Sequence, residues 1–376
     1  MALYLQTGNI DQASAPQETA RNMPKHKLID RAAFPSKIRM PNLVQMTGKY
    51  LKTKINPYWK QAEEGSYKWF ESYGIHSDQK LQKFFNTEFG LMGALAFPDA
   101  DLEHLRPAMD FVLWLFTFDD LTDTEGLRDD INGVENAVNE VMDVLRNPNV
   151  AQPKFIAAQM LQSFYCRIQA DSTEATIQRL IEACEGYTQA TLKQTMNRSF
   201  DDLPTIDEFI QLRRETSAMK VFYPILEYSL SLDLPVEVFT DPVMAELLVA
   251  ANDLLTWAND VYSFPIEQSR GDTHNLVFIV MWNEGLDLEG AMDYMDKLMQ
   301  KRLQEYLDAK AQLRSFGPKV DSQLVSYIQG VEYCVQGSIA WTFMTPRYFG
   351  SDAEKVRETS IADIMIPESL APMVTA

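Results

Sequence analysis

The chain is poor in cysteine and in basic residues. Of its 376 residues only three are cysteines, Cys166, Cys184 and Cys334, and no two of them form a CxxC pair. This spacing excludes a disulfide framework and a CxxC zinc site, and it is typical of buried free thiols in a reducing compartment. With 34 Lys and Arg against 53 Asp and Glu, the formal net charge is -19. Because phosphate backbones are bound by basic surfaces, we do not expect a nucleic-acid-binding protein.

Targeting signals, membrane spans and common catalytic motifs are also missing. Residues 1–22 are largely polar and do not resemble a secretory signal. No stretch approaches the roughly 18 to 20 apolar residues of a membrane span, so we expect a cytoplasmic protein with no membrane partner. GxGxxG, GxxxxGK[ST], HExxH and GxSxG do not occur, which leaves nucleotide binding and the common hydrolase chemistries without support. The four histidines are too far apart to indicate a local pair of ligands: His26, His76, His104 and His274.

What the chain has is helical periodicity. In residues 291–318, methionines and other apolar side chains recur at steps of three and four residues until Gly317 and Pro318 end the run. No alternating β-branched runs joined by hairpin turn pairs occur, so the sequence predicts an all-α protein. The same helical spacing recurs in four further stretches: 78–97, 134–147, 153–170 and 205–230.

The predicted organisation is a single domain with short ends. Residues 1–40 contain several prolines and predict an irregular N-terminal arm. Residues 351–376 predict a C-terminal tail. Between them, residues 41–350 contain no Gly/Ser linker and no repeat, which favours one large helical domain over two smaller ones.

An acidic cluster follows an apolar run in residues 111–126, FVLWLFTFDDLTDTEG. If the helix continues through Asp123, about 100° per residue leaves Asp119 and Asp123 roughly 40° apart on one face, one turn from each other. Carboxylates gathered beside an apolar segment repel one another unless water or a cation compensates them. Taken alone, the cluster fits either a solvated helix end or a site for a hard divalent cation such as Mg²⁺.

A second polar row lies in residues 257–275. Asn259, Ser263 and Glu267, here called the downstream row, follow one another at four-residue steps, so an amide, a hydroxyl and a carboxylate share one helix face. The alternatives are a solvent-facing polar stripe and a second metal site. Apolar side chains around the row indicate a buried helix and favour the metal site.

The same segment offers a competing set of ligands. Asn252, Thr256 and Asp260, here called the upstream row, have the same spacing seven residues earlier and therefore lie on nearly the same face. We prefer the downstream row because it ends in the longer glutamate and leaves Arg270 one turn beyond it. Pro265 removes one backbone hydrogen bond within the downstream row, so we expect it to bend the helix.

With these motifs the chain resembles the class I terpene synthases, particularly the fungal (basidiomycete) sesquiterpene synthases. DDLTD, residues 119–123, resembles their aspartate-rich motif, and NDVYSFPIE, residues 259–267, resembles their second metal motif. Arg213 lies 46 residues before the second motif, where the family has a diphosphate-sensing arginine. RYFG, residues 347–350, resembles the family's C-terminal Arg-Tyr pair.

The resemblance implies a class I terpenoid synthase bundle around a central apolar cavity. It also implies Mg²⁺-dependent ionisation of farnesyl diphosphate, a small-molecule substrate, and cyclisation of the resulting carbocation to a sesquiterpene. Three Mg²⁺ ions are expected, two at the aspartate-rich motif and one at the downstream row. The implied metal ligands are Asp119, Asp123, Asn259, Ser263 and Glu267. Either a monomer or a homodimer is compatible with the sequence.

The family pattern assigns further roles. Asp120, the second acid of the motif, is expected to bind basic residues of the closed site and no metal. Thr216 and Ser217 occupy the positions that follow the sensing arginine. The expected diphosphate-binding residues are Arg213, Arg270, Arg347 and Tyr348, and all of these except Arg270 are expected to be catalytic. The expected pocket residues are Phe116, Leu115, Ser217 and Trp341.

Two departures and two rival functions complete the predictions. Many relatives carry a basic residue just before the glutamate, where this chain has Ile266, and Leu115 stands at a position that is often aromatic. A prenyl-chain-elongating synthase is also helical and Mg²⁺-dependent, but it needs a second aspartate-rich motif. A non-catalytic helical scaffold explains the helices and the acidity, but it gives no reason for two rows of oxygen ligands and spaced arginines.

Overall fold

The computed structural model describes most of the chain. Described are residues 29, 31–123, 127, 130–149, 151–197 and 203–365, without the side chains of Ala32, Asp123 and Asn197.

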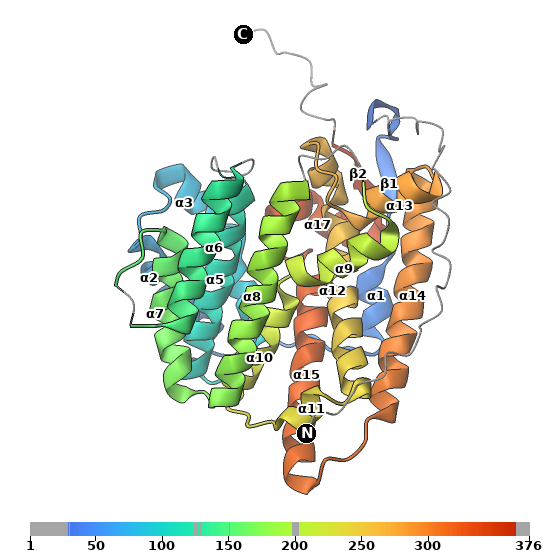
Figure 1. Ribbon diagram of the computed structural model, residues 1–376. Coiled ribbons are helices and arrows are strands. Elements are labelled where there is room, and N and C mark those ends of the chain that lie inside the picture. Colours follow the sequence, from blue (N-terminus) through green and yellow to red (C-terminus); the bar gives the residue numbers. More distant parts are fainter. Residues whose placement is uncertain are drawn as a thin grey trace, which may run out of the picture.

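The described residues form a helical bundle (Figure 1). The first half contains η1 (Arg31–Ala33), β1 (Lys37–Arg39), α1 (Leu43–Gly48), α2 (Trp59–Glu71), α3 (Asp78–Phe85), α4 (Phe89–Ala96), α5 (Leu102–Asp123), α6 (Ile131–Arg146), α7 (Ile156–Asp171) and α8 (Glu174–Asn197). The second half contains α9 (Ile206–Thr216), α10 (Met219–Ser229), α11 (Val236–Phe239), α12 (Pro242–Ser269), α13 (Leu276–Glu284), α14 (Leu288–Gln312), α15 (Pro318–Trp341), α16 (Pro346–Phe349), η2 (Gly350–Asp352), α17 (Ala353–Thr359) and β2 (Ile361–Asp363). The predicted all-α class is confirmed.

The two helices that carry the predicted motifs contain them as the sequence indicates. Helix α5 is described through Asp123 and includes the whole acidic motif, residues 119–123. Helix α12 begins after Asp241, whose carboxylate accepts hydrogen bonds from the first turn, and Pro242 stands at the first position, where no backbone donor is needed. Although Pro265 lies within α12, the helix continues unbroken to Ser269.

Long helices surround the central cavity. Helix α12 packs against α14, α15, α13 and α9, and α15 packs against α4 and α10 on its other side. Helix α5 packs against α2, α4 and α7. Figure 1 shows α5, α8, α12, α14 and α15 running roughly along one direction, with α9 and α13 near the upper end of α12. The two predicted metal motifs therefore lie on different helices of one bundle.

The two ends of the described chain meet near the end of α12. Strand β1 pairs antiparallel with β2, with Ile38 opposite Ala362. Gln268 donates from Nε2 to the carbonyl of Met365 at 2.7 Å. We predicted an irregular arm and tail here; within the described residues both contain short ordered elements, because each three-residue strand is stabilised by pairing with the other. The domain bounds themselves stay a prediction.

Two further predictions concern the cysteines and the membrane. In the described part, Cys184 and Cys334 are buried free thiols, but Cys166 is exposed on α7, so the expectation of burial was wrong for that residue. Among the described helices none is long and apolar enough to cross a membrane. The cellular compartment stays a prediction.

Candidate active site

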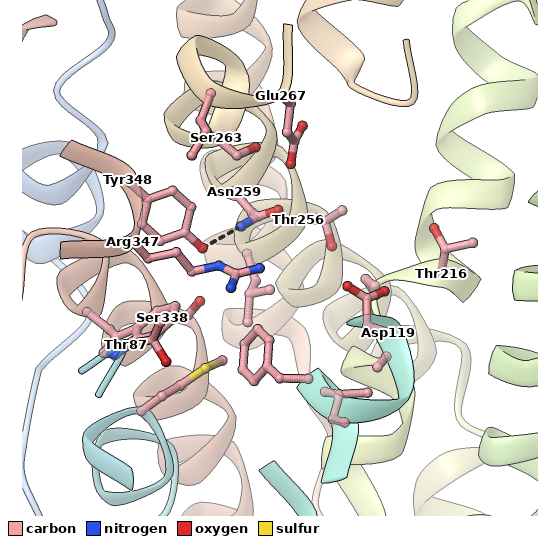
Figure 2. A pocket seen from close by; sticks show the side chains of 18 of the residues that line it. Thr87, Asp119, Thr216, Thr256, Asn259, Ser263, Glu267, Ser338, Arg347 and Tyr348 are labelled. Atoms are coloured by element: carbon pink, nitrogen blue, oxygen red, sulfur yellow. Dashed lines mark hydrogen bonds between the residues drawn. The ribbon is translucent and has the colours of Figure 1, made fainter. Parts of the chain in front are cut away.

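A cavity of about 660 Å³ lies between the helices that carry the predicted motifs. Polar side chains from α5, α9, α12 and α16 meet at it (Figure 2). An apolar part of the lining comes from five helices: Met92, Leu115, Phe116, Met219, Phe222, Leu255 and Trp341. A cavity that combines an apolar wall with converging polar groups is the usual form of a small-molecule site.

Helix α5 brings one predicted metal ligand to the cavity. Asp119 lines the cavity, with Leu115 and Phe116 one turn before it on the same wall. Asp120 is half-buried and is not among the lining residues. The side chain of Asp123 lies outside the described residues, so its predicted pairing with Asp119 stays a prediction.

The downstream row of α12 faces the same cavity. Asn259, Ser263 and Glu267 all line it, and Figure 2 shows them one above another along the helix. Ser263 is 3% exposed, and its Oγ has no hydrogen-bond partner within the described part of the chain. A buried hydroxyl without a partner costs free energy, which a ligand at this position would recover.

The amide of Asn259 is held from both sides. Its Oδ1 accepts a hydrogen bond from Arg213 Nη2 at 3.0 Å, and its Nδ2 donates to the Tyr348 hydroxyl at 3.0 Å (Figure 2). An amide oxygen has two lone pairs, so Oδ1 retains capacity for one more partner. Two chain segments that lie far from α12 in the sequence therefore meet at Asn259.

Glu267 is in an unusual electrostatic setting. Burial, together with the negative charges of Asp272 and Asp260, raises the pKa of the Glu267 carboxyl to about 7, although Asn275 and Arg213 counteract this. A nearby cation favours the charged form of a carboxylate. The carboxyl is therefore placed where a bound cation would stabilise it.

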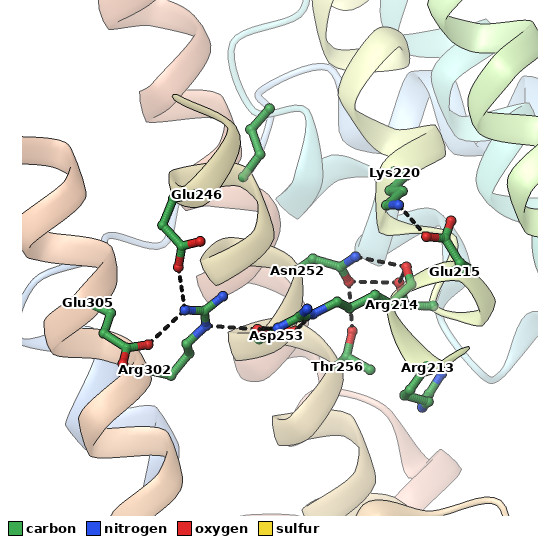
Figure 3. Close-up of polar contacts among 12 residues, drawn as sticks. Arg213, Arg214, Glu215, Lys220, Glu246, Asn252, Asp253, Thr256, Arg302 and Glu305 are labelled. Carbon is green, nitrogen blue, oxygen red and sulfur yellow. Dashed lines mark hydrogen bonds and ion pairs between the residues drawn. The ribbon is translucent and has the colours of Figure 1, made fainter. Parts of the chain in front are cut away.

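The upstream row has a different environment. Asn252 accepts hydrogen bonds at Oδ1 from Ser217 Oγ at 2.8 Å and from Thr256 Oγ1 at 2.9 Å. Its Nδ2 donates to the carbonyl of Arg214 at 2.9 Å (Figure 3). Asp260 accepts from Arg213 at one oxygen and from the backbone N–H of Leu276 at the other. The polar atoms of the upstream row are thus engaged within the protein.

Helix α9 carries two consecutive arginines that bond different residues of α12. A capping box of Thr205 and Glu208 starts the helix. Arg214 forms two hydrogen bonds with the buried Asp253, which Arg302 also contacts (Figure 3). The ion pair of Arg214 with Asp253 connects α9 to α12.

Arg213 instead lines the cavity, where it bonds Asn259 and Asp260. Burial lowers the pKa of the Arg213 guanidinium, but the charge and hydrogen bonds of Asp260 outweigh it, so the pKa ends above its usual value. Arg213 therefore stays charged at the cavity wall.

The helical conformation is interrupted between α9 and α10, at the cavity wall. Ser217 follows α9 and lines the cavity, as predicted, but its hydroxyl is directed to Asn252. Ala218 then takes a left-handed conformation with φ +58° before α10 begins. A left-handed alanine is strained, since its Cβ lies too close to the following carbonyl.

The C-terminal Arg-Tyr pair closes another side of the cavity. The Arg347 guanidinium lies 5.3 Å from the centre of the Phe116 ring and 5.6 Å from that of Phe89. Tyr348 packs edge-on against Trp341, and burial raises the pKa of its hydroxyl. Both rings of the predicted aromatic wall, Phe116 and Trp341, therefore lie directly beside the polar rim.

Of the other predicted residues, Arg270 and Thr216 also line the cavity. Sequence reasoning missed several lining residues because they belong to no motif and their spacing indicates only a helix or a loop: Lys83, Asn86, Thr87, Tyr187, Gln194, Asp272, His274, Ser338 and Met365. His274 is half-buried, and its ring centre lies 4.9 Å from that of Phe209.

An all-α bundle whose acidic and arginine-bearing rim lies above an aromatic cavity has the architecture of a class I terpene synthase. The comparisons with known proteins agree. The chain belongs to terpene synthase family 2: residues 110–305 match the family model described as "Terpene synthase family 2, C-terminal metal binding".

The relatives extend over nearly the whole chain. It is 33% identical to sesquiterpene synthase Agr1 of Cyclocybe aegerita over 353 residues, which is 94% of this chain and 97% of that protein. It is 35% identical to sesquiterpene synthase 3 of Postia placenta over 321 residues, covering 85% and 86% of the two chains. The fold is similar to that of germacradien-4-ol synthase from Streptomyces citricolor, with a TM-score of 0.70 at 20% identity over 78% of this chain and 96% of that one.

Family membership has two consequences. The protein is a class I terpene cyclase that acts on a prenyl diphosphate, and its matched region is a metal-binding domain. Among the described side chains, no group of three His, Cys, Asp or Glu is arranged to hold a metal ion. The downstream row instead combines one carboxylate with an amide and a hydroxyl oxygen.

Proposed function

We propose that the protein is a Mg²⁺-dependent sesquiterpene cyclase that ionises farnesyl diphosphate and closes the carbocation into a ring. The observation that carries the proposal is that Asp119 and the downstream row open onto one cavity with an apolar, aromatic wall. The names of the two fungal relatives support the sesquiterpene class.

The residues fit a hard divalent cation. The downstream row offers an amide oxygen, a hydroxyl without a partner and a carboxylate, all of which are oxygen ligands of the kind that Mg²⁺ prefers. We assign one ion to this row and two to Asp119 with Asp123. Magnesium, when bound, supplies positive charge that offsets the diphosphate and stabilises it as a leaving group.

Four side chains would bind the diphosphate directly. Arg213, Arg270 and Arg347 line the cavity, and the Tyr348 hydroxyl lies beside Asn259. In a chain of net charge -19, these local donors and the metal ions are what allow an anion of about -3 to approach. Charge-assisted hydrogen bonds to the oxygens strengthen as the C–O bond breaks and negative charge accumulates on the leaving group.

The apolar wall would protect and fold the cation. Phe116 and Trp341 present ring faces or edges near the rim, and the Arg347 guanidinium already lies over Phe116. An aromatic face that holds a guanidinium can also stabilise a passing carbocation by cation–π attraction. Excluding water keeps the cation from being quenched before the ring closes.

Chain elongation is the second candidate, and one feature argues against it. The position where an elongating enzyme needs a second aspartate-rich motif carries the downstream row, which begins with an asparagine. We therefore favour cyclisation of a single substrate.

The test is incubation of the purified protein with farnesyl diphosphate and Mg²⁺, with gas chromatography and mass spectrometry of the products and an assay of released diphosphate. We expect a cyclic C15 product without isopentenyl diphosphate, and no reaction with EDTA. Geranyl and geranylgeranyl diphosphate serve as chain-length controls. A requirement for isopentenyl diphosphate would contradict cyclisation, and no diphosphate release from any substrate would contradict catalysis.

A further inference from the structure

Asn275 connects the metal-facing carboxylate to the rest of the site. It is the N-cap of α13 and is 1% exposed. Its Nδ2 donates to the carbonyl of Asp260 at 2.7 Å and to Glu267 Oε2 at 2.9 Å. Its Oδ1 accepts from the backbone N–H of Val277 at 2.9 Å. Both amide hydrogens and the amide oxygen are therefore engaged, and the side chain has one orientation.

This orientation fixes one end of Glu267. A glutamate has several rotatable bonds, but binding Oε2 to Asn275 restricts the carboxylate and leaves Oε1 as the oxygen without that tether. Asn275 itself cannot move easily, because Asp260 accepts from the neighbouring Leu276 N–H at 3.0 Å while bonding Arg213. The loop that carries Asn275 is thus fastened to α12 at two consecutive residues.

We propose that Asn275 is a positioning residue that presets the Glu267 carboxylate for a divalent cation. The inference rests on the proposed function, since it assumes that Glu267 is a metal ligand. Carboxylates that bind metals are commonly held by a hydrogen bond from a neighbouring group, and removing that group weakens metal binding. Asn275 meets this requirement without itself lining the cavity.

The contacts distinguish this role from simple helix capping. A cap needs only an oxygen acceptor, and aspartate caps helices about as well as asparagine. The Nδ2 group contributes nothing to the cap, yet it makes both of the remaining bonds. Asn275→Asp therefore keeps the acceptor for Val277 and replaces the donor to Glu267 with an oxygen that repels it.

The experiment compares Asn275→Asp and Asn275→Ala with wild type and with Asp287→Ala. Asp287 caps α14 through the N–H of Gly290 at 2.8 Å and does not line the cavity, so its variant reports the loss of a cap alone. Two quantities are measured: Mg²⁺ affinity by calorimetry in the presence of inorganic diphosphate, and the Mg²⁺ concentration at half-maximal turnover of farnesyl diphosphate.

We expect both Asn275 variants to bind Mg²⁺ about 10- to 100-fold more weakly than wild type. Excess Mg²⁺ should restore turnover, while Asp287→Ala should bind Mg²⁺ as wild type does. An Mg²⁺ affinity of Asn275→Asp equal to that of wild type would overturn the inference. So would loss of the folded state in both variants when Asp287→Ala remains folded, because Asn275 would then serve the fold. If wild type itself neither binds Mg²⁺ nor turns over substrate, the proposed function fails first.

Discussion

Two rows of polar side chains stand seven residues apart on α12, with similar composition and different surroundings, although Thr256 of the upstream row also lines the cavity. In the upstream row the polar atoms find partners within the protein. Asn252 accepts from Ser217 and from Thr256 of its own row, and Asp260 accepts from Arg213 and Leu276. In the downstream row Ser263 has a buried hydroxyl with no partner in the described residues, and all three side chains line the cavity. Residue type and spacing therefore do not distinguish a ligand-binding row from a structural one. What distinguishes them is whether the protein leaves oxygen atoms without partners for a ligand to bind.

The two rows also depend on each other. Arg213 bonds Asp260 of the upstream row and Asn259 of the downstream row at 2.8 and 3.0 Å. The upstream row thereby holds the Arg213 guanidinium next to the candidate metal site. The comparison predicts that changes in the downstream row affect catalysis, whereas a change at Asn252, which does not contact Arg213, affects stability.

The largest expected effect comes from the proposed metal ligands. Glu267→Gln and Asp119→Asn each remove a charged oxygen ligand and no core contact, so turnover should fall at least about 100-fold, or about 2.7 kcal/mol in the barrier. The measurement is diphosphate release at saturating substrate, with thermal unfolding as the control. Near wild-type turnover in either variant would contradict the assignment of these side chains as metal ligands.

A smaller effect, on stability, is expected from Asn252→Ala. The change removes the acceptor of the Thr256 hydroxyl and one bond each from Ser217 and the Arg214 carbonyl, which still bond each other. These losses should lower the free energy of unfolding by about 2 kcal/mol. Urea unfolding measures this loss. The Mg²⁺ concentration for half-maximal turnover should not change; a large increase would mean that the upstream row also serves the metal.

The smallest effect, again on stability, is expected at the interruption between α9 and α10. Ala218 has φ +58°, so Ala218→Gly should relieve strain and raise the free energy of unfolding by about 1 kcal/mol. Ala218→Val, which is β-branched, is the matched control and should destabilise the protein. Equal stability of the two variants would show that the left-handed conformation is not maintained in solution.

The sequence predicted those parts of the structure that follow from periodicity and from motif spacing. Helix α5 carries the acidic motif through Asp123, as the helical spacing allowed, and the downstream row faces inward because its neighbours are apolar. Helix α12 continues past Pro265 to Ser269 because a single lost backbone bond does not end a helix. The bend that we expected at Pro265 stays a prediction.

Other features depend on contacts between segments that are distant in the sequence. Strands β1 and β2 are three residues each and lie 322 positions apart between Arg39 and Ile361, so neither has a pattern of its own. Asn275 belongs to no motif, and its contact with Glu267 arises only once the loop folds back on α12. Cys166 is exposed because of its face on α7, which composition alone does not reveal.

The central claim is tested most directly by a crystal structure of the protein with Mg²⁺ and inorganic diphosphate. Our account predicts one ion bound by Asn259, Ser263 and Glu267, with oxygen to metal distances of about 2.0 to 2.1 Å, and further ions at Asp119. It also predicts that Arg213 and Arg347 contact the diphosphate. Metal ions bound elsewhere, with Ser263 Oγ still lacking a partner at saturating Mg²⁺, would contradict it.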